Sequence, residues 1–148
     1  MCIFVFLKSE EETKCLGKNI AKELIPNSLL LLKGPIGSGK TSIVKGIAEG
    51  LCVKENITSP TFALSHHYYS GLIPIIHMDL YRLEAEISAK ELFLEEEEEA
   101  KENGAILIIE WPELILSTVK SFWLIEIEYA KDFGREYKLH KPLDFKKV

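Results

Sequence analysis

The hydrophobic residues of the chain fall into short runs typical of strands and into longer segments with helical spacing. The clearest runs, 28–33 and 105–110, are almost wholly apolar, as in strands that are covered on both faces. Five other segments also have the character of strands: 3–7, 62–69, 74–79, 122–130 and 135–140. We expect the last two to form a closing pair around a turn at 132–134.

Helical spacing is clearest in 9–24, where apolar residues recur every four positions. Ser9 and Glu12 have the spacing of a capping box at its start. A second helix is expected to follow the Gly-rich turn after the first buried run and to end near Gly50. A third helix is expected over 84–102.

The Gly-rich turn, GPIGSGKTS, matches the pattern of a phosphate-binding loop. Gly34, Gly39, Lys40 and Thr41 have the required spacing, and the loop lies between an apolar strand and a helix. Gly37 and Gly39 can adopt positive φ, so successive N–H groups can point at phosphate oxygens. Lys40 is expected to reach the β- and γ-phosphates, and Thr41 to offer its hydroxyl to Mg²⁺. The predicted nucleotide-binding residues of the loop are Gly34, Pro35, Ile36, Gly37, Ser38, Gly39, Lys40, Thr41 and Ser42.

Strands that alternate with helices indicate α/β layers. Together with the loop, this alternation predicts a three-layer P-loop NTPase fold. The central sheet should be mostly parallel, with helices on both faces and antiparallel strands at the C-terminal end. The chain has 148 residues without a repeat or a linker, so we expect one ATPase domain over 1–148.

A phosphate-binding loop needs a carboxylate at the end of a buried strand to hold the magnesium shell. Glu110 ends a clean apolar run, which makes it the better candidate, with glutamate replacing the usual aspartate. Asp79 follows a shorter run that His77 interrupts, and one site can use both acids. The spacing of His77, Asp79 and Tyr81 places these three on one face. The predicted metal ligands are therefore Thr41, Glu110 and Asp79.

Two other polar clusters have competing interpretations. Zinc usually takes three or four converging ligands, whereas adjacent His66 and His67 would point to opposite faces of a strand. A polar role at the rim of a nucleotide site is therefore favoured for the histidines over a zinc site. The simplest interpretation of the acidic run 95–99 is a helix face exposed to solvent. The alternative, which is more specific, is a docking site for a basic partner.

Composition narrows the class of protein. Hydrophobic residues make up 47% of the chain, which is enough for a hydrophobic core. Net charge is -5, and the sequence lacks the stripe of basic residues that is typical of a protein that binds nucleic acid without a partner. The N-terminal stretch lacks the features of a signal peptide, and no run approaches the length of a membrane span. The three cysteines form no CxxC pair, so reduced thiols in a cytoplasmic protein are expected.

Several P-loop classes are disfavoured by what the sequence lacks. There is no Asn-Lys-x-Asp segment for reading guanine. Only two arginines, Arg82 and Arg135, are present, whereas a small-molecule kinase usually closes a lid that carries several. Arg82 can reach a phosphate or a partner carboxylate, and Arg135 is either an ordinary strand residue or a nucleotide contact.

Four segments, GPIGSGKTS, SPTFALSHHY, HMDLYRLE and LIIEWPE, occur in this order along the chain. Together they resemble the signature of the bacterial tRNA threonylcarbamoyladenosine biosynthesis ATPase, the TsaE (YjeE) family, over about 13–135. Pro35 departs from the family, which usually has an acidic residue there, and His67 stands where the family usually has glutamate.

The resemblance implies an ATPase in the complex that forms the N6-threonylcarbamoyl group on adenosine 37 of tRNAs reading ANN codons. The implied partners are the transferase subunit and its inactive paralogue, with tRNA as an indirect substrate and ATP and Mg²⁺ as cofactors. A nucleotide-sensing binding module without significant turnover is the alternative. The residues implied for the site are Asp79, Tyr81 and Arg82 at the catalytic edge, Trp111 beside it, Thr13 near the adenine, and the phosphate loop with Thr41 and Glu110 on ATP and Mg²⁺. We also expect Lys40 of the loop to act in catalysis and Arg135 to contact the nucleotide.

Overall fold

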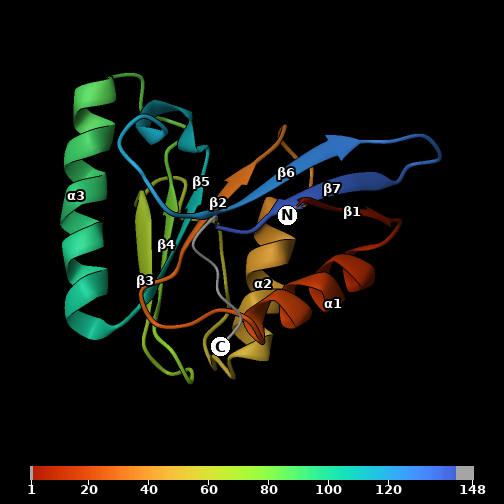
Figure 1. The fold of residues 1–148 in the computed structure, drawn as a ribbon, viewed down its shortest axis with the longest axis horizontal. Coiled ribbons are helices and arrows are strands. Elements are labelled where there is room, and N and C mark those ends of the chain that lie inside the picture. The colour runs from red at the N-terminus through yellow and green to blue at the C-terminus, as the bar shows by residue number, and fades with distance from the viewer. Residues whose placement is uncertain (1, 143–148) are drawn as a thin grey trace.

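A computed structural model describes residues 2–142 of the chain, and its strands and helices alternate as the sequence pattern predicts (Figure 1). The strands are β1 (Cys2–Leu7), β2 (Leu29–Lys33), β3 (Ser65–Tyr68), β4 (Ile75–Asp79), β5 (Ile106–Glu110), β6 (Trp123–Tyr129) and β7 (Arg135–His140). The helices are α1 (Glu10–Ala21), α2 (Lys40–Gly50), α3 (Glu86–Asn103) and the short 3-10 helix η1 (Pro112–Ile115).

All seven strands form one sheet, in the order β1-β7-β6-β2-β5-β4-β3. The four central strands, β6, β2, β5 and β4, are parallel, so their carboxyl ends meet at the same edge. The predicted antiparallel closing pair is present as β6 and β7, and β1 extends it. The opposite edge is also antiparallel, because β3 pairs with β4 in that direction. The α/β fold, with a parallel centre and antiparallel strands at the C-terminal end of the chain, is thus confirmed, and the sheet as a whole is mixed because β3 is also antiparallel.

The sheet is covered by helices on both faces, which gives three layers (Figure 1). Alternate side chains of β2 show why Leu30, Leu31 and Leu32 are all fully buried. Leu30 and Leu32 pack into the core that includes residues of α1 and α2. Leu31 packs into the other core, which includes residues of α3 and η1. A strand placed between two such cores has no polar face, as its sequence predicts.

Helices α1 and α2 approach each other closely because glycines occupy their contact. A Cβ on Gly46 would lie 2.3 Å from the carbonyl oxygen of Lys14, and one on Gly17 would lie 2.6 Å from that of Ile43. Side chains at these positions would push the helices apart. The close contact fixes α2, whose N-terminus forms part of the site described below.

Element boundaries differ from the prediction where polar contacts or turns intervene. The helix predicted over 9–24 ends at Ala21, although Leu24 is still buried. The capping contact is confirmed, since the amide of Glu12 donates to Ser9 Oγ over 3.1 Å. The strand predicted over 62–69 is only Ser65–Tyr68, because a turn precedes it. Within residues 2–142, no helix is both long enough and apolar enough to cross a membrane.

Candidate functional site

The loop between β2 and α2 has the backbone conformation that a phosphate cradle requires. Gly37 and Gly39 have φ values of 73° and 105°, as predicted from their residue type. Gly39 is the N-cap of α2 and no side chain caps that helix, so the N–H groups of its first turn have no side-chain acceptor. A helix N-terminus with free N–H groups is suited to an anion.

The ammonium group of Lys40 lies inside this loop. Its Nζ donates hydrogen bonds to the carbonyl oxygens of Gly34 and Pro35, at 2.6 and 2.8 Å. It also lies 4.4 Å from the centre of the Trp111 ring. Burial lowers the pKa of Lys40 below its ordinary value of 10.5, and the nearby carboxylates, led by Glu110, oppose that shift. The cation is therefore held next to the loop backbone.

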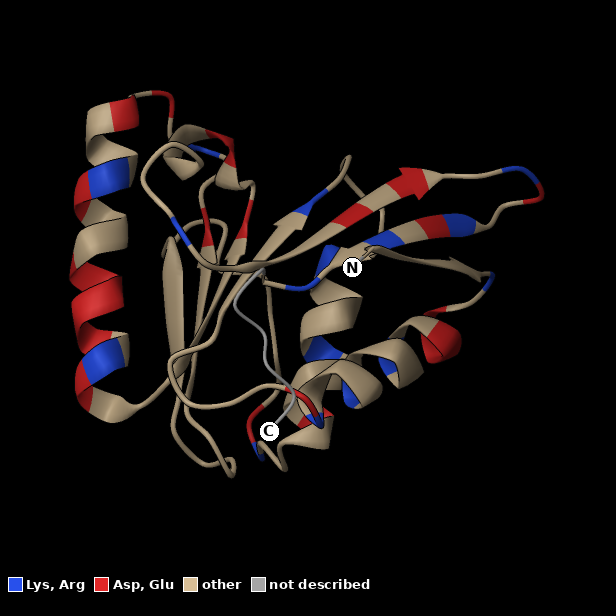
Figure 2. Ribbon diagram, viewed as in Figure 1, with Lys and Arg blue, Asp and Glu red and all other residues tan. Residues whose placement is uncertain are grey.

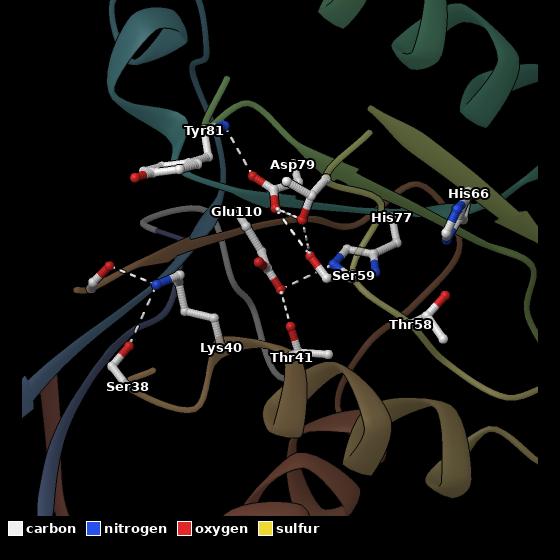
Figure 3. A network of polar contacts seen from close by, with 12 residues as sticks. Ser38, Lys40, Thr41, Thr58, Ser59, His66, His77, Asp79, Tyr81 and Glu110 are labelled. Carbon is white, nitrogen blue, oxygen red and sulfur yellow. Dashed lines mark hydrogen bonds and ion pairs between the residues drawn. The ribbon is translucent and has the colours of Figure 1, made fainter. Parts of the chain in front are cut away.

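Glu110 joins the loop helix to the central sheet (Figure 3). It ends β5, and its Oε1 accepts a hydrogen bond from the Thr41 hydroxyl over 3.1 Å. The same oxygen lies 3.1 Å from Nε2 of His77, which is on β4. The carboxylate is almost entirely buried, with a relative exposure of 3%. The buried apolar run thus delivers its glutamate to the first turn of α2.

Asp79 lies at the end of β4, beside Glu110 but with different partners (Figure 3). Its Oδ2 accepts from the hydroxyls of Ser59, at 3.1 Å, and Thr61, at 3.4 Å. Its Oδ1 accepts from the backbone N–H of Tyr81 over 2.9 Å. Asp79 therefore anchors two segments, the loop that precedes β3 and the turn that follows β4.

These groups surround a cavity of about 410 Å³. On one side, the rings of Tyr81 and Trp111 lie 4.9 Å apart. Trp111 has a φ of 57°, which turns the chain sharply after Glu110. The cavity is lined by Ile36, Gly37, Ser38, Gly39, Lys40, Thr41, Ser42, Ser59, Thr61, Asp79, Tyr81, Glu110 and Trp111.

A second hollow, of about 180 Å³, lies against the same loop and includes Thr13 and Arg135. The Thr13 hydroxyl contacts Tyr137 Oη at 3.0 Å and donates to the carbonyl of Ser9 at 3.1 Å. Tyr137 is fully buried, and burial raises the pKa of its hydroxyl. Thr13 is therefore engaged by internal contacts while it still borders this hollow.

The β6–β7 hairpin contacts the backbone of the phosphate loop through two of its side chains. The Tyr129 hydroxyl donates to the carbonyl oxygen of Ile36. Arg135 stacks on the Tyr129 ring at 4.5 Å, and its guanidinium lies 3.5 Å from the carbonyl oxygen of Gly37. Arg135 thus contacts the backbone of the phosphate loop directly. The sequence alone left open whether Arg135 is an ordinary strand residue or a nucleotide contact.

Arg82 lies apart from the other predicted residues. Its guanidinium stacks on the ring of Phe62 at 3.9 Å, and the Phe62 side chain is 83% exposed. Arg82 is not among the residues that line either hollow. Within the chain itself, the turn after β4 therefore directs Tyr81 into the cavity and Arg82 onto an exposed aromatic ring.

Four residues contribute to this arrangement although the sequence analysis did not name them as site residues. Ser59 and Thr61 were expected in a loop and belong to the segment SPTFALSHHY, which resembles the family signature. Their hydroxyls were the available signal, but nothing in the sequence places them beside Asp79. His77 was expected on one face with Asp79 and Tyr81, at the rim of the nucleotide site, and Tyr129 was assigned only to a strand. All four act through contacts that join distant parts of the chain.

The histidines do not form a metal site within residues 2–142, where no three His, Cys, Asp or Glu side chains converge. His66 contacts Tyr68 Oη at 3.2 Å, whereas His67 lies 2.6 Å from Glu96 on α3. The acidic run is therefore not wholly a solvated face. Figure 2 shows acidic residues concentrated along α3, which also carries Lys90 and Lys101, while further Lys and Arg are spread over several other elements.

Comparison with known families finds a match over residues 7–137 to the model of "Threonylcarbamoyl adenosine biosynthesis protein TsaE". The chain is 36% identical over 136 residues to a tRNA threonylcarbamoyladenosine biosynthesis protein TsaE from Nostoc, covering 91% of this chain and 83% of that protein. It is 39% identical over 127 residues to the protein of that name from Bacillus subtilis, covering 85% and 77%.

A solved structure shares the fold. The crystal structure of Bacillus subtilis YdiB superposes with a TM-score of 0.77 at 28% sequence identity, covering 94% of this chain and 84% of that chain. Similarity in sequence and in fold therefore extends over nearly the whole described chain, including every element that borders the two hollows.

Proposed function

Because the chain belongs to the TsaE family of threonylcarbamoyl adenosine biosynthesis proteins, we propose that it is the ATPase component of that pathway. A role in the biosynthesis of threonylcarbamoyladenosine in tRNA follows from the family. The finer proposal is that the chain is a single domain over 1–148 that binds and hydrolyses ATP with Mg²⁺ in the cytoplasm. Its complex would form N6-threonylcarbamoyladenosine at position 37 of tRNAs reading ANN codons.

The loop fits a nucleotide polyphosphate by its backbone and by its charge. Gly37 and Gly39 have positive φ, and the first turn of α2 has no side-chain cap. Lys40 donates to two loop carbonyls, and its ammonium can exchange these acceptors for phosphate oxygens with little movement. The loop would thus bind the phosphates through N–H groups and one cation. Tyr129 and Arg135 would keep it in that conformation.

The observation that carries the proposal is the hydrogen bond from Thr41 to Glu110. Since Thr41 gives its only hydroxyl proton to Glu110, the lone pairs of its oxygen are left for a cation. Hard oxygen ligands of this kind suit Mg²⁺, which usually binds to one or two carboxylates together with substrate phosphates. We assign Thr41 and Glu110 as the primary pair. Bound Mg²⁺ would neutralise charge that develops on the phosphate oxygens.

Asp79 has a different role in this proposal. Its carboxylate accepts from Ser59, Thr61 and the backbone of Tyr81, so it lies at the junction of two loops that border the cavity. A carboxylate so placed can orient a water molecule or accept its proton. Tyr81 and Trp111 would shield one side of the cavity from bulk water.

Turnover would depend on partner subunits. Arg82 stacks on Phe62 outside the cavity, and Arg135 is engaged with the loop backbone. Neither arginine lines the larger cavity. The basic side chain that lines it is that of Lys40. A positive group supplied in trans can raise the rate of phosphoryl transfer by about 10³–10⁵. The proposed partners are the threonylcarbamoyl transferase subunit and its inactive paralogue, with tRNA as an indirect substrate.

The second candidate is a nucleotide-sensing module without significant turnover. Neither arginine lines the larger cavity, which also favours this candidate, because nucleotide binding does not require an arginine there. A steady-state ATPase assay with and without the purified partner subunits separates the two functions. The ATPase proposal expects slow hydrolysis by the isolated chain and faster hydrolysis with the partners. Tight binding without turnover under either condition would favour the sensing module.

A further inference from the structure

His77 occupies a place in the sheet where an apolar residue would be the simpler choice. All five residues of β4 are buried, and the His77 side chain has a relative exposure of 0%. Its Nδ1 is buried without a hydrogen-bond partner. Burying a polar ring with an unpaired nitrogen costs free energy. A compensating role is therefore expected from its other nitrogen, Nε2, which lies 3.1 Å from Glu110 Oε1.

The contact is built into the pairing of two buried strands. His77 on β4 lies opposite Ile108 on β5, and Glu110 is two residues farther along β5. Residues two apart on a strand share a face, so the imidazole reaches diagonally across to the carboxylate. Both strands lie in the parallel centre of the sheet. This donor therefore belongs to the rigid scaffold.

The chemistry fixes which atom donates. An ionised carboxylate can only accept, so the hydrogen bond requires a proton on His77 Nε2. Thr41 donates to the same oxygen of Glu110. Among residues 2–142, the hydrogen bonds to this carboxylate end on Oε1, so Oε2 is available to the cavity.

We propose that His77 is a positioning residue for Glu110, whose carboxylate it orients for Mg²⁺-dependent nucleotide binding. It fixes Oε1 from the sheet, independently of the loop helix that carries Thr41. The inference rests on the proposed function. It adds a requirement that the loop and the acidic residue alone do not impose, namely a hydrogen-bond donor on the neighbouring strand.

Three substitutions separate this role from simple packing. In His77→Gln, the side-chain amide nitrogen can occupy the place of Nε2 and donate to Glu110. In His77→Asn the amide is one methylene shorter and cannot reach, and His77→Leu removes the donor. His66→Leu is the matched control, because His66 pairs with His77 across the strands and contacts Tyr68 rather than Glu110.

The measurement is calorimetric titration with a non-hydrolysable ATP analogue, in Mg²⁺ and in EDTA. The gain in affinity that Mg²⁺ provides should fall about 10–100-fold in His77→Asn and His77→Leu, the usual cost of removing such an outer partner. His77→Gln should recover most of that gain, and His66→Leu should keep it. Affinity in EDTA should be unchanged in all variants, because the phosphate loop is intact.

Three outcomes would overturn the inference. In the first, folded His77→Asn keeps the full Mg²⁺-dependent gain. In the second, the Gln and Asn variants lose it equally. In the third, none of the three variants folds, which would make His77 structural only. Failure of the unmodified chain to bind the analogue would contradict the proposed function instead, so the two failures are distinguishable.

Discussion

Asp79 and Glu110 lie opposite each other at the ends of β4 and β5, yet each carboxylate has its own set of hydrogen-bond donors. Glu110 accepts from Thr41 of the phosphate loop, whereas Asp79 accepts from Ser59 and Thr61. The two adjacent acids therefore contact different segments of the chain, which supports the proposed division of their roles, with Glu110 on the cation and Asp79 on water.

The division of roles predicts different defects in two alanine variants. Glu110→Ala should remove most of the Mg²⁺ dependence of nucleotide affinity, because Thr41 loses its acceptor and the cation loses a carboxylate. Asp79→Ala should keep that dependence and lower turnover by about 10²-fold or more, the usual contribution of a positioned acid or base. Titrations with and without Mg²⁺ and a steady-state assay measure both. Loss of the metal effect in Asp79→Ala alone would reverse the assignment.

Lys40→Ala should lower nucleotide affinity while the fold survives. The lost interaction is a charge-assisted hydrogen bond to phosphate, so we expect a decrease of about 10–100-fold. Lys45→Ala is the matched control, since Lys45 is on the same helix and lies 3.9 Å from exposed Glu10. Calorimetry with an ATP analogue and circular dichroism provide the measurements. Equal affinity in the two folded variants would remove the phosphate-loop assignment.

Tyr129→Phe should loosen the loop without removing any group that touches phosphate. The variant loses the hydrogen bond to the carbonyl oxygen of Ile36, so the loop is less well ordered before binding. We expect an affinity about 3–10-fold lower, in line with one neutral hydrogen bond. Tyr69→Phe removes a hydroxyl that contacts Glu99 far from the site and should leave affinity unchanged. A similar decrease in both variants would contradict this role for Tyr129.

Gly46→Ala tests the contact between α1 and α2. Alanine in a helix interior is ordinarily more favourable than glycine by about 0.5–1 kcal/mol. Here the added Cβ would lie 2.3 Å from the carbonyl oxygen of Lys14. We therefore expect alanine to destabilise the protein, lowering the free energy of unfolding by about 1–3 kcal/mol. Urea unfolding measures it, with Glu98→Ala as the control, because Glu98 is exposed on α3 and lies outside the contact between α1 and α2. A more stable Gly46→Ala variant would show that the helices can separate without cost.

The sequence predicted those parts of the fold and site that follow from local pattern. The leucines of β2, the isoleucines of β5 and the glycines of the loop were assigned correctly because burial and positive φ leave a signature in residue type. Thr41 and Glu110 were placed together by the loop motif and the end of a buried strand, and they are hydrogen-bonded.

The rest depends on contacts between distant segments. Nothing in the spacing of Ser59 or Tyr129 indicates that one reaches Asp79 and the other reaches Ile36. Arg82 follows Tyr81 directly, and no feature of the residue pattern indicates that their side chains lie in different places. The turn after β4 nevertheless places Arg82 on Phe62. Register and turn geometry decide such contacts, and residue type alone does not encode them.

The central claim is that this chain hydrolyses ATP as a partner-dependent component of tRNA modification. The most direct test is reconstitution with the transferase subunit, its inactive paralogue, ATP, threonylcarbamoyl-adenylate and unmodified tRNA, following ATP hydrolysis and modified adenosine together. We expect slow hydrolysis by the chain alone, a rise of about 10³-fold or more with the partners, and repeated rounds of modification only when the chain is present. Equal hydrolysis with and without the partners, together with repeated modification in the absence of this chain, would contradict it.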